Sequence, residues 1–139
     1  QPLITRHTVV QVDEEDASKK AVKWQRVALG ACKQCGQNLL PEVAAPRNFA
    51  DWLPQAGGDL KVIASLFPGA RPLREILRSV PPPARVTLLV GPEGDFSLEE
   101  GAAAVAAGFL PATLGSIVLR AETASFFGIS ALRYEFSLE

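Results

Sequence analysis

The sequence predicts an α/β fold with a mostly parallel sheet flanked by helices. Segments with strand patterning alternate with segments of helical patterning along the chain, which is typical of this class. The segment 85–90 is apolar on both faces, as expected for a parallel strand that is covered on both sides. The length of 139 residues fits one domain, so we expect a single domain over residues 1–139.

The composition indicates a folded chain without a strong charge. Apolar residues make up 47% and charged residues 21%, which argues against disorder. The net charge of -1 predicts no general electrostatic attraction to nucleic acid, so RNA affinity must be local or come from another part of the protein. No apolar run approaches the ~20 residues of a membrane span. Met is absent even at position 1, so we expect a processed chain or a fragment.

The first half of the chain carries clear start and stop signals. A β-branched segment predicts the first strand, and Ser18 is a candidate N-cap for the helix that follows. Gly36 supplies a stop for this helix, and Asn48 is a candidate cap for the next, short helix. The elements expected here are a strand over 7–12, a helix over 21–35, a short helix over 49–53 and a strand over 60–67.

The second half repeats the alternation. Pro72 suits the first position of a helix that three prolines close after residue 80. Ser97 and Glu100 form a capping box for an alanine-rich helix that stops at Gly108. The elements expected here are a helix over 72–80, a strand over 85–90, a loop over 91–96, a helix from 97 to 108, a short strand over 112–114, a loop over 115–121 and a helix over 122–136.

The two cysteines, Cys32 and Cys35, have the spacing of a redox or zinc motif. They lie at the C-terminal end of the predicted helix, where the helix dipole opposes a thiolate. A zinc site needs about four ligands, and only His7 remains as a further soft one. We therefore expect core packing on one helix face, no bound metal, and a reducing, cytoplasmic environment.

Arg71, Arg74 and Arg78 fall on one stripe of the predicted helix over 72–80. Such a stripe can hold phosphates, as in an RNA-binding surface, or it can be a solvated face. Both interpretations stay open, and the second is the commoner one.

Two glycine loops each follow a strand and precede a helix, the position at which α/β sheets bind ligands. The first, Gly91-Pro92-Glu93-Gly94, lacks the Gly-Lys-Ser/Thr of a phosphate loop, and its glutamate would repel phosphate. An ordinary tight turn and a ligand site fit it equally. The second loop, from Gly115, leads to Arg120 and Glu122, which could simply pair at a helix entry. The combination of both loops favours a site.

Taken in order, these segments resemble RsmE-type methyltransferases of the SPOUT class. The resemblance rests on Leu-Val-Gly-Pro-Glu-Gly-Asp-Phe-Ser over 89–97, Ala-Gly-Phe over 107–109, the segment 114–124, and the segments 24–28, 34–36 and 41–43. It implies a C-terminal trefoil knot, a rare exception to the rule against threaded chains. It also implies S-adenosylmethionine-dependent methylation of N3 of a uridine in small-subunit (16S) ribosomal RNA. A homodimer is expected as well. The family also carries an N-terminal strand-helix and a PUA-type RNA-binding domain, and we expect both to be missing from this sequence.

The resemblance further implies which residues form the site. The loops would bind the methyl donor through Leu89, Val90, Gly91, Pro92, Glu93, Gly94, Leu114, Gly115, Ser116, Val118, Leu119 and Arg120. Arg120 is the candidate for stabilising negative charge on uracil or for fixing the donor, and Arg6 is the second candidate. Glu122 would orient Arg120 or accept the proton. Arginine stays protonated and cannot act as the base.

Three positions depart from the family pattern. Asp95 stands where the family usually has a second glycine, and Ile117 and Gln37 stand where it has arginines. These departures keep an alternative open, in which the chain is a catalytically decayed binding or scaffold module on the same fold. A flavodoxin-like nucleotide binder would require a phosphate loop that the sequence lacks.

Overall fold

The computed structural model describes residues 1–9 and 14–136. The described elements are, in chain order, β1 (Leu3–Ile4), α1 (Glu14–Cys35), β2 (Arg47–Asn48), α2 (Phe49–Trp52), the short 3-10 helix η1 (Leu53–Gln55), β3 (Leu60–Ala64), β4 (Arg71–Pro72), α3 (Leu73–Arg78), β5 (Val86–Leu89), α4 (Leu98–Ala106), β6 (Leu110–Thr113) and α5 (Ala121–Phe136). No helix of the described part is long and apolar enough to cross a bilayer.

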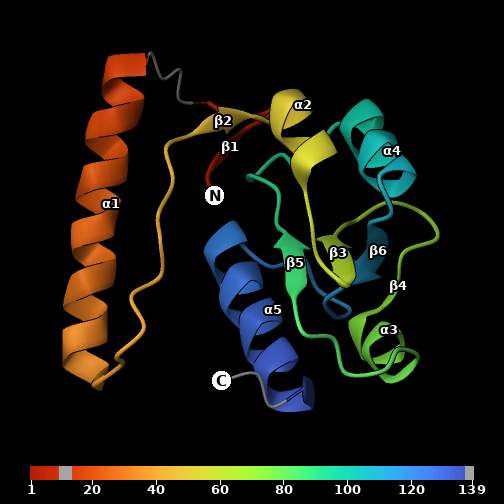
Figure 1. Cartoon of the computed structure of the whole chain (residues 1–139). Coiled ribbons are helices and arrows are strands. Elements are labelled where there is room, and N and C mark those ends of the chain that lie inside the picture. The colour runs from red at the N-terminus through yellow and green to blue at the C-terminus, as the bar shows by residue number, and fades with distance from the viewer. Residues whose placement is uncertain (10–13, 137–139) are drawn as a thin grey trace.

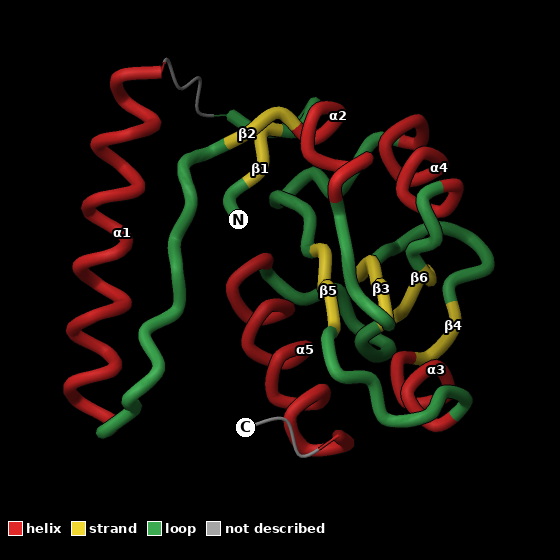
Figure 2. The backbone as a smooth tube through the Cα atoms, viewed as in Figure 1, coloured by secondary structure: helices red, strands yellow, loops and turns green. Residues whose placement is uncertain are grey.

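Both sheets are parallel, which confirms the predicted fold class. The larger sheet has the order β4-β6-β3-β5, and β1 pairs with β2 in a separate two-stranded sheet. In the larger sheet Val62 of β3 lies opposite Leu88 of β5 on one side and Leu110 of β6 on the other. Figure 2 shows these strands at the centre with helices around them. Parallel neighbours require long crossover connections, and the helices provide them.

Two apolar clusters cover the two faces of the larger sheet. Successive residues of β3 point to opposite faces, so Ile63 packs with residues of α2 and α4, whereas Val62 packs with residues of α3 and α5. Successive residues of β5 also point to opposite faces, because Leu89 packs in the first cluster and Leu88 against the second. The prediction that the segment 85–90 is covered on both faces is therefore confirmed.

Helix α1 lies to one side of the other elements, beside the extended segment 37–46 (Figure 1). The Gln25 side chain joins the two, because it donates to the Pro41 carbonyl at 2.9 Å and accepts from the Val43 N–H at 2.8 Å. Cys32 is buried in this contact, but Cys35 is exposed. The predicted core packing is thus right for Cys32 and wrong for Cys35, which lies on the exposed side of α1.

The helix signals in the sequence are largely confirmed. The Ser97 hydroxyl accepts from the Glu100 N–H, and the Glu100 carboxylate accepts from the Ser97 N–H, so α4 begins with a complete capping box. Gly36 ends α1 with a φ of 71°. Ser18 does not cap a helix, because α1 begins at Glu14. Asn48 is the N-cap residue of α2 but makes no side-chain capping bond.

Several predicted elements differ from the structure. The helix predicted over 21–35 begins at Glu14, and the strand predicted over 112–114 spans Leu110–Thr113. The helix predicted over 72–80 spans Leu73–Arg78, with Pro72 as its N-cap instead of its first residue. The predicted strand over 7–12 is wrong at residues 7–9, because Thr5 and Thr8 bond to each other across a turn; residues 10–12 lie outside the described part. The predicted strand over 60–67 ends at Ala64. Arg71 lies in β4 and not on a helix, so only Arg74 and Arg78 share the exposed face of α3.

Candidate functional site

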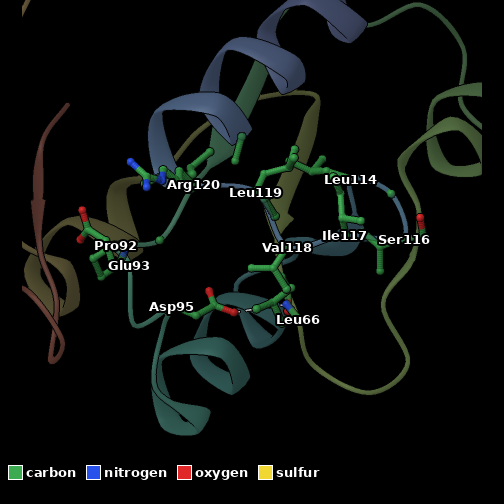
Figure 3. Close-up of a pocket in the computed structure, with 18 residues that line it drawn as sticks. Leu66, Pro92, Glu93, Asp95, Leu114, Ser116, Ile117, Val118, Leu119 and Arg120 are labelled. Carbon is green, nitrogen blue, oxygen red and sulfur yellow. Dashed lines mark hydrogen bonds between the residues drawn. The ribbon is translucent and has the colours of Figure 1, made fainter.

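A cavity of about 400 Å³ lies where three parallel strands end (Figure 3). Its walls are the segment 64–66 after β3, the segment 90–95 after β5 and the segment 113–121 after β6, and Ala124 of α5 closes it. The carboxyl ends of parallel strands meet at one edge of the sheet, where open α/β sheets bind their ligands. The volume lies in the range of small-molecule sites, roughly 300–1,000 Å³.

The second wall depends on a glycine at its start. A Cβ at Gly91 would lie 2.9 Å from Asp95 Oδ1 and 3.1 Å from Asp95 Cα, so the chain can fold back only over a glycine. Asp95 closes this turn, because its N–H donates to the Pro92 carbonyl at 2.9 Å. Asp95 has a φ of 57°, a conformation that asparagine and aspartate adopt more readily than other side chains.

The lining is mainly apolar with a few charged groups. Leu66, Ile117 and Val118 expose most of their side chains to solvent at the cavity. Glu93, Asp95 and Arg120 are the charged residues of the lining. Apolar walls with a small number of polar groups are typical of sites that hold a small organic ligand.

Most residues assigned to the methyl donor from the sequence line this cavity. The lining includes Val90, Gly91, Pro92, Glu93, Leu114, Gly115, Ser116, Val118, Leu119 and Arg120. Leu89 is buried in the core, and Gly94 lies under the His7 ring. The structure therefore brings together the two glycine loops that lie about 20 residues apart in the sequence.

The three candidate catalytic residues are not gathered at one point. Arg120 is exposed at the end of the third wall, and its carbonyl accepts from the Ala124 N–H at 2.8 Å. Glu122 is exposed in the first turn of α5, and no ion pair or hydrogen bond joins it to Arg120 in the described part of the chain. Arg6 does not line the cavity. Its guanidinium lies 3.6 Å from the Glu99 carboxylate on α4.

The first wall was missed at the sequence level. The predicted strand over 60–67 concealed it, because apolar patterning continues past the last paired residue. Ser65 N–H still donates to the Ala112 carbonyl, but Leu66 N–H turns to the Asp95 carboxylate. The predicted parallel sheet does indicate this wall. The carboxyl end of a central parallel strand must lie at the same edge of the sheet as the two glycine loops. The lining residues missed are Ala64, Ser65, Leu66, Asp95, Thr113, Ile117, Ala121 and Ala124.

A parallel sheet with a cavity formed by three loops at its carboxyl edge defines a ligand-binding α/β domain. Comparison with known families makes the class specific. The model of the RNA methyltransferase domain matches residues 1–133, and the chain belongs to this family.

Individual relatives agree with this assignment. The ribosomal RNA small subunit methyltransferase E of Buchnera aphidicola is 30% identical over 136 residues, which cover 97% of this chain and 52% of that protein. A Legionella pneumophila protein solved with bound SAM is 38% identical with a TM-score of 0.87, covering 96% of this chain and 53% of that one. The ribosomal RNA small subunit methyltransferase E of Neisseria gonorrhoeae, bound to S-adenosyl methionine, is 32% identical with a TM-score of 0.84, covering 96% of this chain and 54% of that one. The chain thus spans about half the length of these proteins, and the resemblance to RsmE-type enzymes is confirmed.

Proposed function

We propose that the chain binds S-adenosylmethionine in the cavity and methylates N3 of a uridine in small-subunit ribosomal RNA. One observation carries the proposal: apart from Leu89 and Gly94, the residues assigned to the donor from the sequence line the same cavity. The likeness to relatives solved with the donor supports the same ligand here.

The residues present fit this donor. S-adenosylmethionine combines an adenine ring, whose flat aromatic faces pack against apolar side chains, with a positively charged sulfonium and ammonium. The apolar side chains of the lining suit the ring, and the exposed Glu93 carboxylate suits a cation. Residues 91–94 and 114–120 would hold the donor largely through backbone groups, as close backbone approach at a glycine allows.

The reaction places separate demands on the protein. When bound, the donor supplies an electrophilic methyl on a positively charged sulfur. Uracil N3 would have to lose its imide proton to solvent or to a base such as Glu122. Its lone pair could then form the bond to the methyl carbon while the bond from carbon to sulfur breaks and its electron pair stays on sulfur, which leaves as a neutral thioether. Arg120 stays protonated, and its guanidinium stabilises the negative charge on the deprotonated uracil. The cavity walls hold the two reactants in line, which supplies much of the acceleration.

The finer features of the fold follow the same proposal. We assign the domain to the SPOUT class, with a trefoil knot formed by the segments 91–94 and 114–120. Residues of both segments line one cavity. We also propose that the active form is a homodimer and that the reaction takes place in the cytoplasm, where small-subunit ribosomal RNA and free cysteines such as Cys32 are found.

Calorimetric titration with S-adenosylmethionine tests the cofactor. We expect micromolar binding by the chain, and a chain without measurable binding would support the decayed scaffold module instead. Val118→Arg places a positive charge in the cavity lining, where it repels the positively charged donor, and should weaken binding at least about tenfold. Val105→Arg is the matched control, because Val105 is an exposed valine of α4 outside the lining, and it should bind normally.

The substrate is tested with an isotopically labelled methyl group. The chain is incubated with labelled donor and a small-subunit ribosomal RNA fragment, and the digested nucleosides are identified by mass spectrometry. We expect the label in 3-methyluridine. Label in another nucleoside would keep the methyltransferase assignment and reject uridine N3.

A further inference from the structure

Asp95 forms hydrogen bonds to its neighbour Phe96 and to two distant segments of the chain. Its Oδ1 accepts from the Phe96 N–H at 2.8 Å, and its Oδ2 accepts from the Leu66 N–H at 3.2 Å. Its backbone carbonyl accepts from Nδ1 of His7 at 2.9 Å. Figure 3 shows the bond from Asp95 to Leu66 across the cavity. One residue therefore ties the second cavity wall to the first wall and to the segment after β1.

The His7 contact holds this arrangement from outside the cavity. A Cβ at Gly94 would lie 3.0 Å from the Cβ of His7 and 3.2 Å from its Cγ, so the imidazole lies directly on the Gly94 backbone. The neighbouring Arg6 N–H donates to the Glu100 carboxylate at 2.9 Å, and the same carboxylate caps α4. The segment 6–7 is thus fastened to both ends of the connection between the second wall and α4.

The conformation of Asp95 indicates that its side chain has a purpose. A φ of 57° is one that glycine adopts without strain, so glycine would close the same turn at less cost. A glycine has no carboxylate, however, and would leave the N–H groups of Leu66 and Phe96 without these acceptors. The turn alone therefore does not require aspartate, whereas the bond between the walls does.

We propose that Asp95 is a positioning residue that fixes the wall 64–66 against the wall 90–95 and thereby sets the affinity of the cavity for the methyl donor. The inference rests on the proposed function, because it names the donor as the ligand. It assigns Asp95 no contact with the reacting atoms. Its carboxylate acts through Leu66, a lining residue whose backbone it holds.

Two substitutions separate the turn from the carboxylate. Asp95→Gly relieves the left-handed conformation and removes both side-chain bonds. Asp95→Asn tolerates the same φ but offers one acceptor oxygen in place of two, so it can serve only one of the two N–H groups. We expect both variants to raise the Kd for S-adenosylmethionine, by about tenfold for the glycine variant and less for asparagine, the scale of losing bonds to a charged acceptor.

Asp59 provides a matched control. Its Oδ2 accepts from the backbone N–H groups of Ala84 and Arg85, both at 2.9 Å, and it does not line the cavity. Asp59→Gly therefore removes two comparable bonds from aspartate to backbone elsewhere in the fold. It should lower the melting temperature and leave the Kd for the donor unchanged.

The measurements are donor titration by calorimetry and amide hydrogen exchange by NMR, both at a temperature where every variant is folded. We expect faster exchange at the Leu66 amide in Asp95→Gly than in the wild type, together with weaker donor binding. Wild-type affinity in Asp95→Gly would overturn the proposal. If the wild type itself binds no donor, the proposed function fails and the assigned ligand with it, and unchanged exchange at Leu66 would then refute the coupling of the two walls as well.

Discussion

The guanidinium of Arg120 is the positive charge of the cavity lining, and the structure leaves it exposed without a bond to Glu122. If it stabilises charge on uracil, Arg120→Ala should lower kcat about 100-fold or more, the scale of removing one preorganised donor. Donor affinity should change little, because backbone groups do most of the holding. Calorimetry and single-turnover methylation measure the two effects.

The control for this prediction is Arg133→Ala. Arg133 is another exposed arginine, but it lies in the last turn of α5 and outside the cavity lining, whereas Arg120 directly precedes that helix. The variant Arg133→Ala should therefore keep the wild-type turnover. If Arg120→Ala also keeps its turnover and loses only some thermal stability, Arg120 is a structural residue of the helix entry and not a catalytic one.

Two helical glycines should respond to alanine in opposite directions. A Cβ at Gly101 in α4 would lie 2.1 Å from the Phe67 ring, whereas a Cβ at Gly30 in α1 meets nothing within 4 Å. Gly30→Ala should therefore stabilise its helix by about 0.5–1 kcal/mol. Gly101→Ala gains the same helix preference but forces the ring to move, and we expect a net loss of about 1–2 kcal/mol. Urea unfolding measures both, and a stabilised Gly101→Ala would show that the ring relaxes freely.

At the scale of elements, the capping box of α4 is the clearest local determinant. Ser97→Ala removes the hydroxyl that accepts from the Glu100 N–H, so it should lower the free energy of unfolding by about 1 kcal/mol. Ser125→Ala is the control, since the Ser125 hydroxyl donates to the Ala121 carbonyl inside α5 and such a bond contributes little. Equal losses in the two variants would contradict the special role of the cap.

Local patterns predicted the elements that local forces determine. The strand over 85–90, the capping box at Ser97 and the stop at Gly36 depend on residues close in sequence, and each is confirmed. The conformation of the segment after β1 does not follow from its local pattern. Its β-branched pattern predicts a strand, but the Thr5–Thr8 turn and the bond from His7 to Asp95 hold it in a different conformation.

The sequence predicts some walls of the candidate site and not others. It predicts the two glycine loops, because their residues suit tight connections between a strand and a helix. It does not predict the wall at Leu66, because the conformation of this wall depends on a carboxylate 29 positions away in the chain. Ile117 was noted only as a departure from the family pattern, whereas the structure makes it part of the lining.

At the scale of the whole molecule, α5 exposes several large apolar side chains. Phe126 is 73% exposed and Tyr134 88%, and Phe127 and Ile129 are also largely exposed. Because an exposed face of this kind requires a cover, we expect an isologous homodimer built on α5. Light scattering at tens of micromolar should give twice the chain mass. Phe126→Glu should give the monomer, and a wild-type monomer at that concentration would reject the prediction.

The overall charge predicts weak RNA binding by this chain alone. With a net charge of -1 the domain lacks the general attraction that positive proteins have for phosphates. We expect a low affinity for a small-subunit RNA fragment and a shallow dependence on salt. A filter-binding titration at two salt concentrations measures both, and tight, strongly salt-dependent binding would contradict the expectation.

The parallel pairing of both sheets also bears on how the chain reaches its fold. Leu3 pairs with Arg47 and Val62 with Leu110, so every strand contact joins distant parts of the chain. The entropy of closing these long loops must be spent before any pair of strands contributes stability. We therefore expect folding on the order of milliseconds or slower, with the apolar residues of β3 and β5 exposed in the meantime. At high concentration this interval favours aggregation, so refolding yield should fall as the concentration of the chain rises.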